Sequence, residues 1–202
     1  MGQTLTPVVR YLLIACVAVF GMQLLAGYRL ADVFALSPVG GAFDATSFHS
    51  WQLITYGFLH GGFTHLLFNM FALYMFGPDI ERLLGYRRFL IYYIVCVIGG
   101  AVAQLLVWRA LDITVSQVVG ASAGIFGLLL AYGLAFPHRR LMLIFPPIPM
   151  PAWLFVTLYG LLELYLGIAG RETSVAHFAH LGGMVGGFAL IMYWRASVRP
   201  RR

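Results

Sequence analysis

The sequence has few charged residues and no lysine. Charged side chains account for 10% of the 202 residues, whereas soluble globular domains carry about 25%. Hydrophobic residues account for 61%. Because a soluble domain needs a charged surface facing water, this shortage excludes an ordinary soluble fold and predicts a surface that faces lipid.

Cysteine is also scarce, and the two cysteines do not indicate a disulfide. Cys16 and Cys96 lie inside apolar runs, which predicts packed thiols. The 13 basic and seven acidic side chains give a net charge of +6. The arginines flank the apolar segments, where they orient helices and meet anionic headgroups. We therefore expect membrane lipid as a partner and no nucleic acid.

Six apolar segments are typical of membrane-spanning helices, which need about 20 residues to cross a bilayer. No internal repeat, low-complexity tract or soluble appendage separates them. The sequence therefore predicts an all-α membrane protein in which residues 1–202 form one domain, a six-helix bundle. The expected spans cover approximately residues 8–27, 62–84, 89–108, 121–136, 149–168 and 174–194.

The arginines are distributed unevenly between alternate loops. Ten lie near the start of the first span, at the end of the second, in the loops that follow the second and fourth, or after the sixth, and three lie in the other loops. Because positively charged loops stay in the cytoplasm, both termini are expected there. The second, fourth and sixth spans then run parallel from the outer side. The size of the chain and the lack of a cleavable signal predict a bacterial inner-membrane location.

The first connection and the fourth span both have unusual lengths. The connection at 28–61 is long and aromatic, so we expect it to lie in the outer interface. The fourth span has only 16 residues, which rise about 24 Å, short of the ~30 Å hydrocarbon core. Its N-terminus is therefore expected below the outer surface, inside protein or beside a water cavity.

Polar side chains within the spans fall at one depth. Ser122 begins the fourth span, His180 lies in the outer part of the sixth, and His65 and Asn69 share one face of the second. A serine hydroxyl is a weak nucleophile that needs an adjacent base, which His180 can supply. His65 and Asn69 can add donors to the Ser122 backbone N–H beside a developing oxyanion. This combination is what acyl transfer to serine requires.

Glycines accompany the serine and the histidine at small-xxx-small spacing. Such spacing lets two membrane helices approach closely. We expect these glycines to bring the fourth and sixth spans within hydrogen-bonding reach of each other. They are Gly120, Gly124, Gly183 and Gly187.

Motifs in this order resemble those of the rhomboid intramembrane serine proteases. The matching pieces, between residues 51 and 187, are Trp51-Gln52, His60-Gly-Gly-Phe-Thr-His65-Leu-Leu-Phe-Asn69, Gly77-x-x-x-Glu81-x-x-x-Gly85, Gly120-Ala-Ser122 and Ala179-His180-x-x-Gly183-x-x-x-Gly187. The family often has arginine where this chain has Gln52, and glycine where it has Ala123.

The resemblance implies a serine endopeptidase that cleaves transmembrane protein substrates within or near the outer half of the bilayer. It implies that Ser122 is the nucleophile and His180 the general base, without metal or cofactor. It also implies an oxyanion hole made by His65, Asn69 and the Ser122 backbone. Structural positions would be Trp51, His60 and Glu81. The fifth span would gate substrate entry through Trp153, Phe155, Leu162 and Tyr165.

Some alternatives remain open. His177, three residues before His180, is a rival base. Glu163 in the fifth span can orient His180 as a third triad member, but the resemblance implies a dyad without an acid, which favours a packing or cavity-lining role. The paired histidines lack a carboxylate cluster in sequence, so no metal site is expected. The alternative function is a catalytically inactive rhomboid-like protein that binds membrane clients, although both Ser122 and His180 are present.

Overall fold

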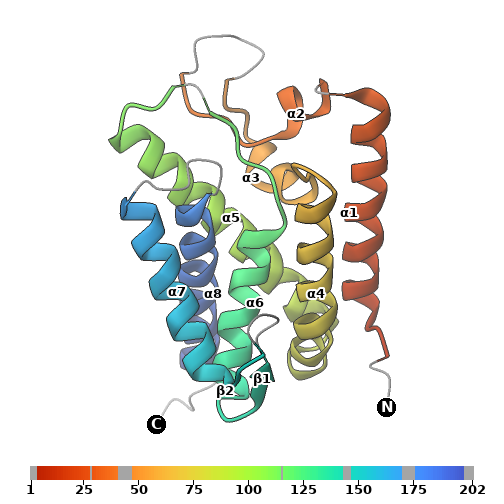
Figure 1. Ribbon diagram of the computed structural model, residues 1–202, viewed down its shortest axis with the longest axis vertical. Coiled ribbons are helices and arrows are strands. Elements are labelled where there is room, and N and C mark those ends of the chain that lie inside the picture. The colour runs from red at the N-terminus through yellow and green to blue at the C-terminus, as the bar shows by residue number, and fades with distance from the viewer. Residues whose placement is uncertain are drawn as a thin grey trace.

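The computed structural model describes residues 4–27, 29–40, 47–114, 116–142, 147–169 and 176–197. Six helices of 14 to 25 residues form a bundle (Figure 1): α1 (Pro7–Ala26), α4 (Phe63–Leu84), α5 (Tyr86–Ala110), α6 (Ser122–Ala135), α7 (Ala152–Ala169) and α8 (His177–Ser197). The first connection holds the short helices α2 (Arg29–Phe34), α3 (Gln52–Thr55) and η2 (Tyr56–Phe58). Strands β1 (Arg140–Met142) and β2 (Pro149–Pro151) form a small antiparallel hairpin. The predicted helical fold class is confirmed.

The fifth predicted span begins too early, because residues 149–151 are a strand. This strand pairs with Arg140–Met142, and α7 starts only at Ala152. Met150 lies between two prolines, and a residue that precedes proline is disfavoured in the α conformation. The other predicted spans agree with helices to within three residues at each end. The predicted start of the sixth span, at 174, lies outside the described residues.

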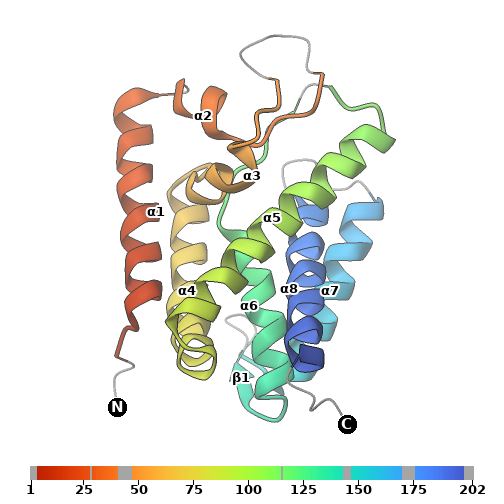
Figure 2. The same ribbon diagram turned by 180° about the vertical axis from the view of Figure 1, so that it is seen from behind.

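Among the residues that the structure describes, three helices are long and apolar enough to cross a membrane, judged by length and composition: α1, α5 and α7. Only 17% of the apolar window of α1 and of α7 is buried. These two helices stand at opposite sides of the bundle (Figures 1 and 2). Their exposed apolar faces are what a lipid-facing surface requires.

Helix α6 lies at the centre of the bundle. It packs against α4, α5, α7 and α8, and ten of its 14 residues are buried. Figure 1 shows that it begins partway down the bundle, after an extended segment that descends from the end where α2 lies. That segment is held by an antiparallel bridge between Leu36 and Val118 and by a bond from the Gly120 N–H to the Tyr56 carbonyl. The first residue of α6 is therefore placed inside the fold.

Small residues let α8 approach two neighbouring helices. A Cβ on Gly183 would overlap the carbonyl oxygen of Ala123 on α6. Gly187 faces a tyrosine of α5 instead, and so does Gly124. The prediction that Gly124 and Gly187 join α6 to α8 is therefore wrong, because α5 crosses both helices diagonally, in front of them in Figure 2, and packs against each.

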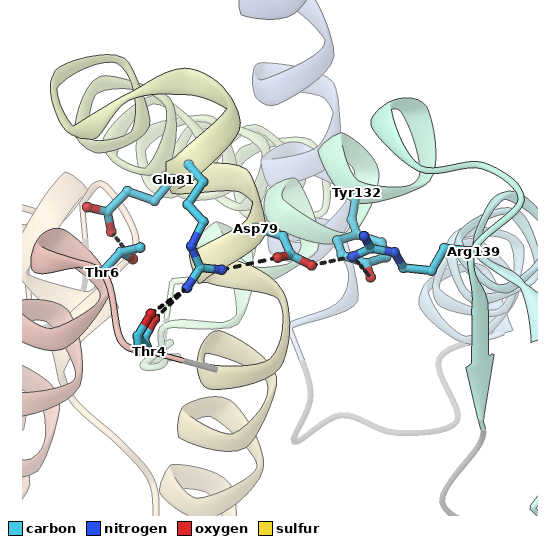
Figure 3. Close-up of polar contacts among 7 residues, drawn as sticks. Thr4, Thr6, Asp79, Glu81, Tyr132 and Arg139 are labelled. Carbon is cyan, nitrogen blue, oxygen red and sulfur yellow. Dashed lines mark hydrogen bonds and ion pairs between the residues drawn. The ribbon is translucent and has the colours of Figure 1, made fainter. Parts of the chain in front are cut away.

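A buried carboxylate at the end of α4 fixes the start of α1. Glu81 is 3% exposed, and its carboxylate accepts the N–H groups of Val8 and Val9 at 3.0 and 2.9 Å and the Thr6 hydroxyl. Backbone N–H groups in a first helical turn have no partner within their own helix. Figure 3 shows the Thr6 contact and, beside it, Asp79 between two arginines, one of them Arg139 of the segment leading to β1.

The first connection is held together by the amide of Gln52. This side chain is fully buried; its Oε1 accepts the N–H groups of Ser37 and His49, and its Nε2 donates to the carbonyl of Val33. The indole N–H of Trp51 donates to the same carbonyl at 3.0 Å. Gln52 thus supplies both donor and acceptor contacts where the resemblance expects arginine.

Candidate active site

Ser122 and His180 meet at the centre of the bundle. The hydroxyl oxygen of Ser122 lies 2.8 Å from Nε2 of His180. Ser122 is the first residue of α6, and His180 lies in the first turn of α8. His180 as a whole residue is 9% exposed. A serine at hydrogen-bonding distance from an imidazole nitrogen is the arrangement needed to activate a nucleophile.

Glu163 of α7 contacts the other side of the His180 ring. Its Oε2 lies 2.8 Å from His180 Nδ1 and 2.7 Å from His177 Nδ1, and the carboxylate is 5% exposed. His177, the rival base, therefore contacts the carboxylate, whereas the Ser122 hydroxyl contacts His180. The structure also brings a carboxylate to the paired histidines, contrary to the sequence expectation. Because the glutamate comes from another helix, no local spacing reveals the cluster.

The ligand atoms of this cluster lie within 4.8 Å of one another, a spacing that can also hold a metal ion. The shortest distances between nitrogen and oxygen atoms in the cluster distinguish metal ligation from hydrogen bonding. Two ligands bonded to one zinc ion at about 2.0 Å in a tetrahedral site lie about 3.3 Å apart. The Nδ1–Oε2 distances of 2.7 and 2.8 Å are hydrogen-bond lengths. The cluster is therefore a hydrogen-bonded carboxylate with two imidazoles.

An aromatic ring covers the face of His180. Phe126 stacks on the imidazole with ring centroids 4.3 Å apart and planes inclined by 6°, and Tyr159 of α7 stacks on Phe126 at 5.1 Å. The sequence argument did not identify Phe126 as a site residue. Its position four residues after Ser122, on the same face of α6, is the signal that finds it.

His65 borders the space beside Ser122. The Gly61 N–H donates to His65 Nδ1 at 3.3 Å, so the neutral ring carries its proton on Nε2. A Cβ on Gly120 would lie 2.9 Å from that Nε2 and 3.5 Å from the Ser122 hydroxyl oxygen. Gly120 has a φ of +134°, which favours glycine. Because Gly120 has no side chain, a space is left that both His65 Nε2 and the Ser122 hydroxyl border.

Asn69 is anchored to its own helix. Its Nδ2 donates to the carbonyl of His65 at 2.9 Å, and the side chain is 7% exposed. An amide nitrogen carries two hydrogens, so one donor remains. The hydrogen bond fixes the amide one turn below His65.

His60 holds the entry to α4. Gln23 of α1 pairs with its backbone, accepting the His60 N–H at 3.0 Å and donating to the His60 carbonyl at 3.2 Å. Burial, and then the neighbouring His65, lower the pKa of His60 to about 4. A neutral His60 ring packs edge-on against His65 at 5.3 Å, which limits the orientations of that ring.

The residues predicted to gate substrate entry lie on α7 and largely face outward. Trp153, Leu162 and Tyr165 are about half exposed, and Phe155 packs against Tyr159 with ring centroids 5.6 Å apart. The helix contacts α6, α8 and the β hairpin. One face of α7 is thus exposed at the periphery, and its Glu163 and Tyr159 contact His180 and Phe126 of the site.

Comparison with known proteins matches residues 47–197 to the Rhomboid domain family. The chain is 31% identical over 188 residues to Rhomboid protein 1, mitochondrial, from Saccharomyces cerevisiae, covering 92% of this chain and 53% of that protein. It is 37% identical over 140 residues to Putative rhomboid protease YdcA from Bacillus subtilis, covering 69% and 65% of the two chains. Rhomboid protease GluP from the same species is 31% identical over 140 residues, covering 68% and 25%.

The chain thus spans roughly half to two thirds of the length of the first two relatives. The family match covers most of this chain, from the first connection to the end of α8, and includes every polar residue of the site. The resemblance seen in the sequence is confirmed. The protein is an integral membrane protein that belongs to the rhomboid family.

Proposed function

We propose that this chain is an intramembrane serine endopeptidase that cleaves transmembrane protein substrates with Ser122 and His180. The observation that carries the proposal is the 2.8 Å contact between the Ser122 hydroxyl and His180 Nε2. It lies at the start of a helix that begins inside the bundle (Figure 1). The protease names of two relatives agree with this activity.

The proposed reaction proceeds by acyl transfer to serine. As the Ser122 oxygen bonds to the scissile carbonyl carbon, its proton moves to His180 Nε2. The carbonyl oxygen becomes an oxyanion in the space beside Gly120, where it accepts hydrogen bonds from the Ser122 N–H, His65 Nε2 and Asn69. His180 then gives its proton to the leaving nitrogen as the C–N bond breaks, and water hydrolyses the ester by the reverse sequence.

The proposed topology has six membrane spans, with both termini in the cytoplasm of a bacterium and the dyad toward the outer half of the bilayer. The arginine distribution supports the orientation. In Figure 1, α1 begins and α8 ends at the same end of the bundle, as an even number of spans requires. Substrate would enter beside α7. The bacterial inner membrane rests on composition, and the relatives include both Bacillus proteins and a mitochondrial one.

The decisive experiment is labelling of detergent-solubilised protein with a serine-directed fluorophosphonate, together with cleavage of a model transmembrane substrate. Wild type should label and cleave, whereas Ser122→Ala should do neither and keep the same melting temperature. Ser197→Ala is a matched control, because this serine lies at the end of α8 and its hydroxyl bonds to its own helix. Wild type that neither labels nor cleaves, but retains membrane clients, would indicate the client-binding alternative.

A further inference from the structure

We infer that Glu163 completes a Ser122–His180–Glu163 triad, as a positioning residue that keeps the His180 proton on Nδ1. The inference rests on the proposed serine protease function. It departs from the dyad that the resemblance implies. It is carried by two contacts to one ring, with Glu163 Oε2 at Nδ1 and the Ser122 oxygen at Nε2, both 2.8 Å long.

The nature of the two contacts fixes the tautomer of His180. An ionised carboxylate can only accept hydrogen bonds. The nitrogen that faces Glu163 must therefore carry the ring hydrogen. In the neutral ring this leaves a lone pair on Nε2, which faces the Ser122 hydroxyl. That is the only tautomer in which His180 can take the serine proton.

His177 holds Glu163 in this position. It donates from its own Nδ1 to the same Oε2 at 2.7 Å, and it lies one turn before His180 on α8. Both donors come from one helix and the acceptor from its neighbour, so the carboxylate is fixed between α7 and α8. The buried His177 Nε2 has no hydrogen-bond partner among the described residues. His177 thus acts on Glu163, which in turn acts on His180.

The His180 ring is constrained on three sides. Glu163 lies at one nitrogen, Ser122 at the other, and Phe126 covers a face at 4.3 Å. A ring held in this way does not lose rotational freedom when the reaction begins, which is the benefit of a preorganised base.

The carboxylate also acts when His180 becomes charged. In the first step the proton leaves the Ser122 oxygen for Nε2, and the ring becomes an imidazolium with a hydrogen on each nitrogen. Its Nδ1–H stays bonded to Glu163, so the positive charge forms next to a negative one between two buried side chains. No proton passes to the carboxylate, and His180 still gives its proton to the leaving nitrogen.

The test compares Glu163→Gln with Glu81→Gln, since both residues are buried carboxylates and only the first faces His180. Steady-state kcat and KM for a transmembrane substrate are measured in one detergent, well below both melting temperatures. Glutamine can present either an oxygen or an NH₂ to Nδ1, so it no longer selects the tautomer. We expect Glu163→Gln to lower kcat by about 10²- to 10⁴-fold with little change in KM. Glu81→Gln should keep kcat within about two-fold, because it is distant from the site.

Folded Glu163→Gln with a wild-type kcat would overturn the triad, and so would a rise in KM alone. If Glu163→Gln does not fold, Glu163→Asp replaces it, since this variant keeps the charge but withdraws the carboxylate by one methylene. Its kcat should fall at least tenfold or so, because the hydrogen bond is broken, and an unchanged kcat would again overturn the inference. Fluorophosphonate labelling of wild type separates the outcomes: no label refutes the protease, whereas equal labelling rates for wild type and Glu163→Gln refute only the triad.

The same measurements decide between a triad and a metal centre at Glu163, His177 and His180. Wild-type kcat should be unchanged by EDTA and should not rise when Zn²⁺ is added. Loss of activity in EDTA that Zn²⁺ restores would overturn the triad, because the three atoms would then be ligands.

Discussion

Glu81 and Glu163 are both glutamates buried between helices, yet different donors reach them. Glu81 accepts backbone N–H groups at the start of α1 and the Thr6 hydroxyl (Figure 3). Glu163 accepts two imidazole N–H groups, one of them from His180. Backbone and hydroxyl donors keep their hydrogens across the physiological pH range, whereas an imidazole gains and loses a proton. The two carboxylates are similarly buried but have different roles. Glu81 fixes the start of α1, and Glu163, as we infer, keeps the His180 proton on Nδ1.

The residues around the two carboxylates also differ, because those near Glu81 are exposed ion pairs and those near Glu163 are buried. Near Glu81, Asp79 contacts Arg82 and Arg139, whose side chains are exposed to about half. Exposed ion pairs of this kind contribute little to stability. Near Glu163 the neighbours are buried rings and a nucleophile. We therefore expect mutation of Glu81, rather than of the exposed arginines beside it, to change stability, and mutation of Glu163 to change kcat.

After the Ser122 and Glu163 variants, the largest expected effect comes from His65. Removing one oxyanion donor typically lowers the rate by about 10²–10³, or ~2.7–4 kcal/mol, and His65→Ala should fall in this range through kcat. Asn69→Ala should cost less, because one of its N–H groups already bonds to the His65 carbonyl. Steady-state kinetics of both variants, with folding checked by thermal melting, provide the measurement. A raised KM with unchanged kcat would mean that these residues bind substrate uniformly.

Glu81→Gln should lower stability without lowering kcat. The amide loses the charge that strengthens the hydrogen bonds to Val8 and Val9. Hydrogen bonds to charged groups contribute about 1.5–3 kcal/mol, so we expect a loss of about 2 kcal/mol. Thermal melting in the same detergent measures this loss. An unchanged melting temperature, or a lower kcat at low temperature, would remove the distinction between the two carboxylates.

Acidification should destabilise the fold through His60. Burial lowers its pKa in the folded protein to about 4, whereas an unfolded histidine titrates near 6.5. Below about pH 6.5 only the unfolded chain takes up the proton, so stability is lost as the pH falls toward 4 and is regained above 6.5. The loss between pH 7 and 5 should approach about 2 kcal/mol. Melting curves at both pH values should show a smaller change for His60→Gln than for wild type. The exposed His138 offers the control, because His138→Gln should keep the wild-type change.

The smallest expected effect concerns the gate on α7. If opening of this helix limits turnover, Leu162→Ala or Tyr165→Ala should raise kcat by about two- to five-fold. Leu24→Ala is a matched control on α1, which is equally peripheral and lies on the opposite side of the bundle (Figure 1). Equal acceleration by Leu24→Ala would indicate a general loosening of the bundle. A disulfide between α7 and α4 that leaves cleavage of transmembrane substrates unchanged would exclude lateral entry at α7.

The sequence predicted the helices well because each is an apolar run with clear ends. The strand at residues 149–151 was missed, since Pro149 and Pro151 lie at the edge of an apolar run and their pairing with β1 is a tertiary contact. The glycine contacts were only partly predicted. The spacing of glycines shows which face of a helix carries small residues, but not which neighbouring helix packs against that face. Gly124 and Gly187 were expected between α6 and α8, and both contact α5 instead.

In the candidate site, too, the sequence identifies residues but not the neighbours that they contact. Ser122, His180, His65 and Asn69 were named because each lies in an apolar span, where a polar side chain is costly. Glu163 was named for the same reason, with His180 as a possible partner, but a packing or cavity-lining role was favoured. A sequence gives the depth of Glu163 and not the rotation of α7, which decides whether its carboxylate points at His180 or away from it. Phe126 was missed because an aromatic residue in an apolar helix gives no polar signal.

The contact between Ser122 and His180 joins residues 58 positions apart, on α6 and on α8. This separation has a consequence for synthesis. A chain emerging from the ribosome presents Ser122, Gly120 and His65 before it presents His180, which lies later in the chain, on α8. Under the proposed mechanism, an incompletely translated chain has no means of activating Ser122. The protease would therefore stay inert beside other nascent membrane proteins until α8 has inserted.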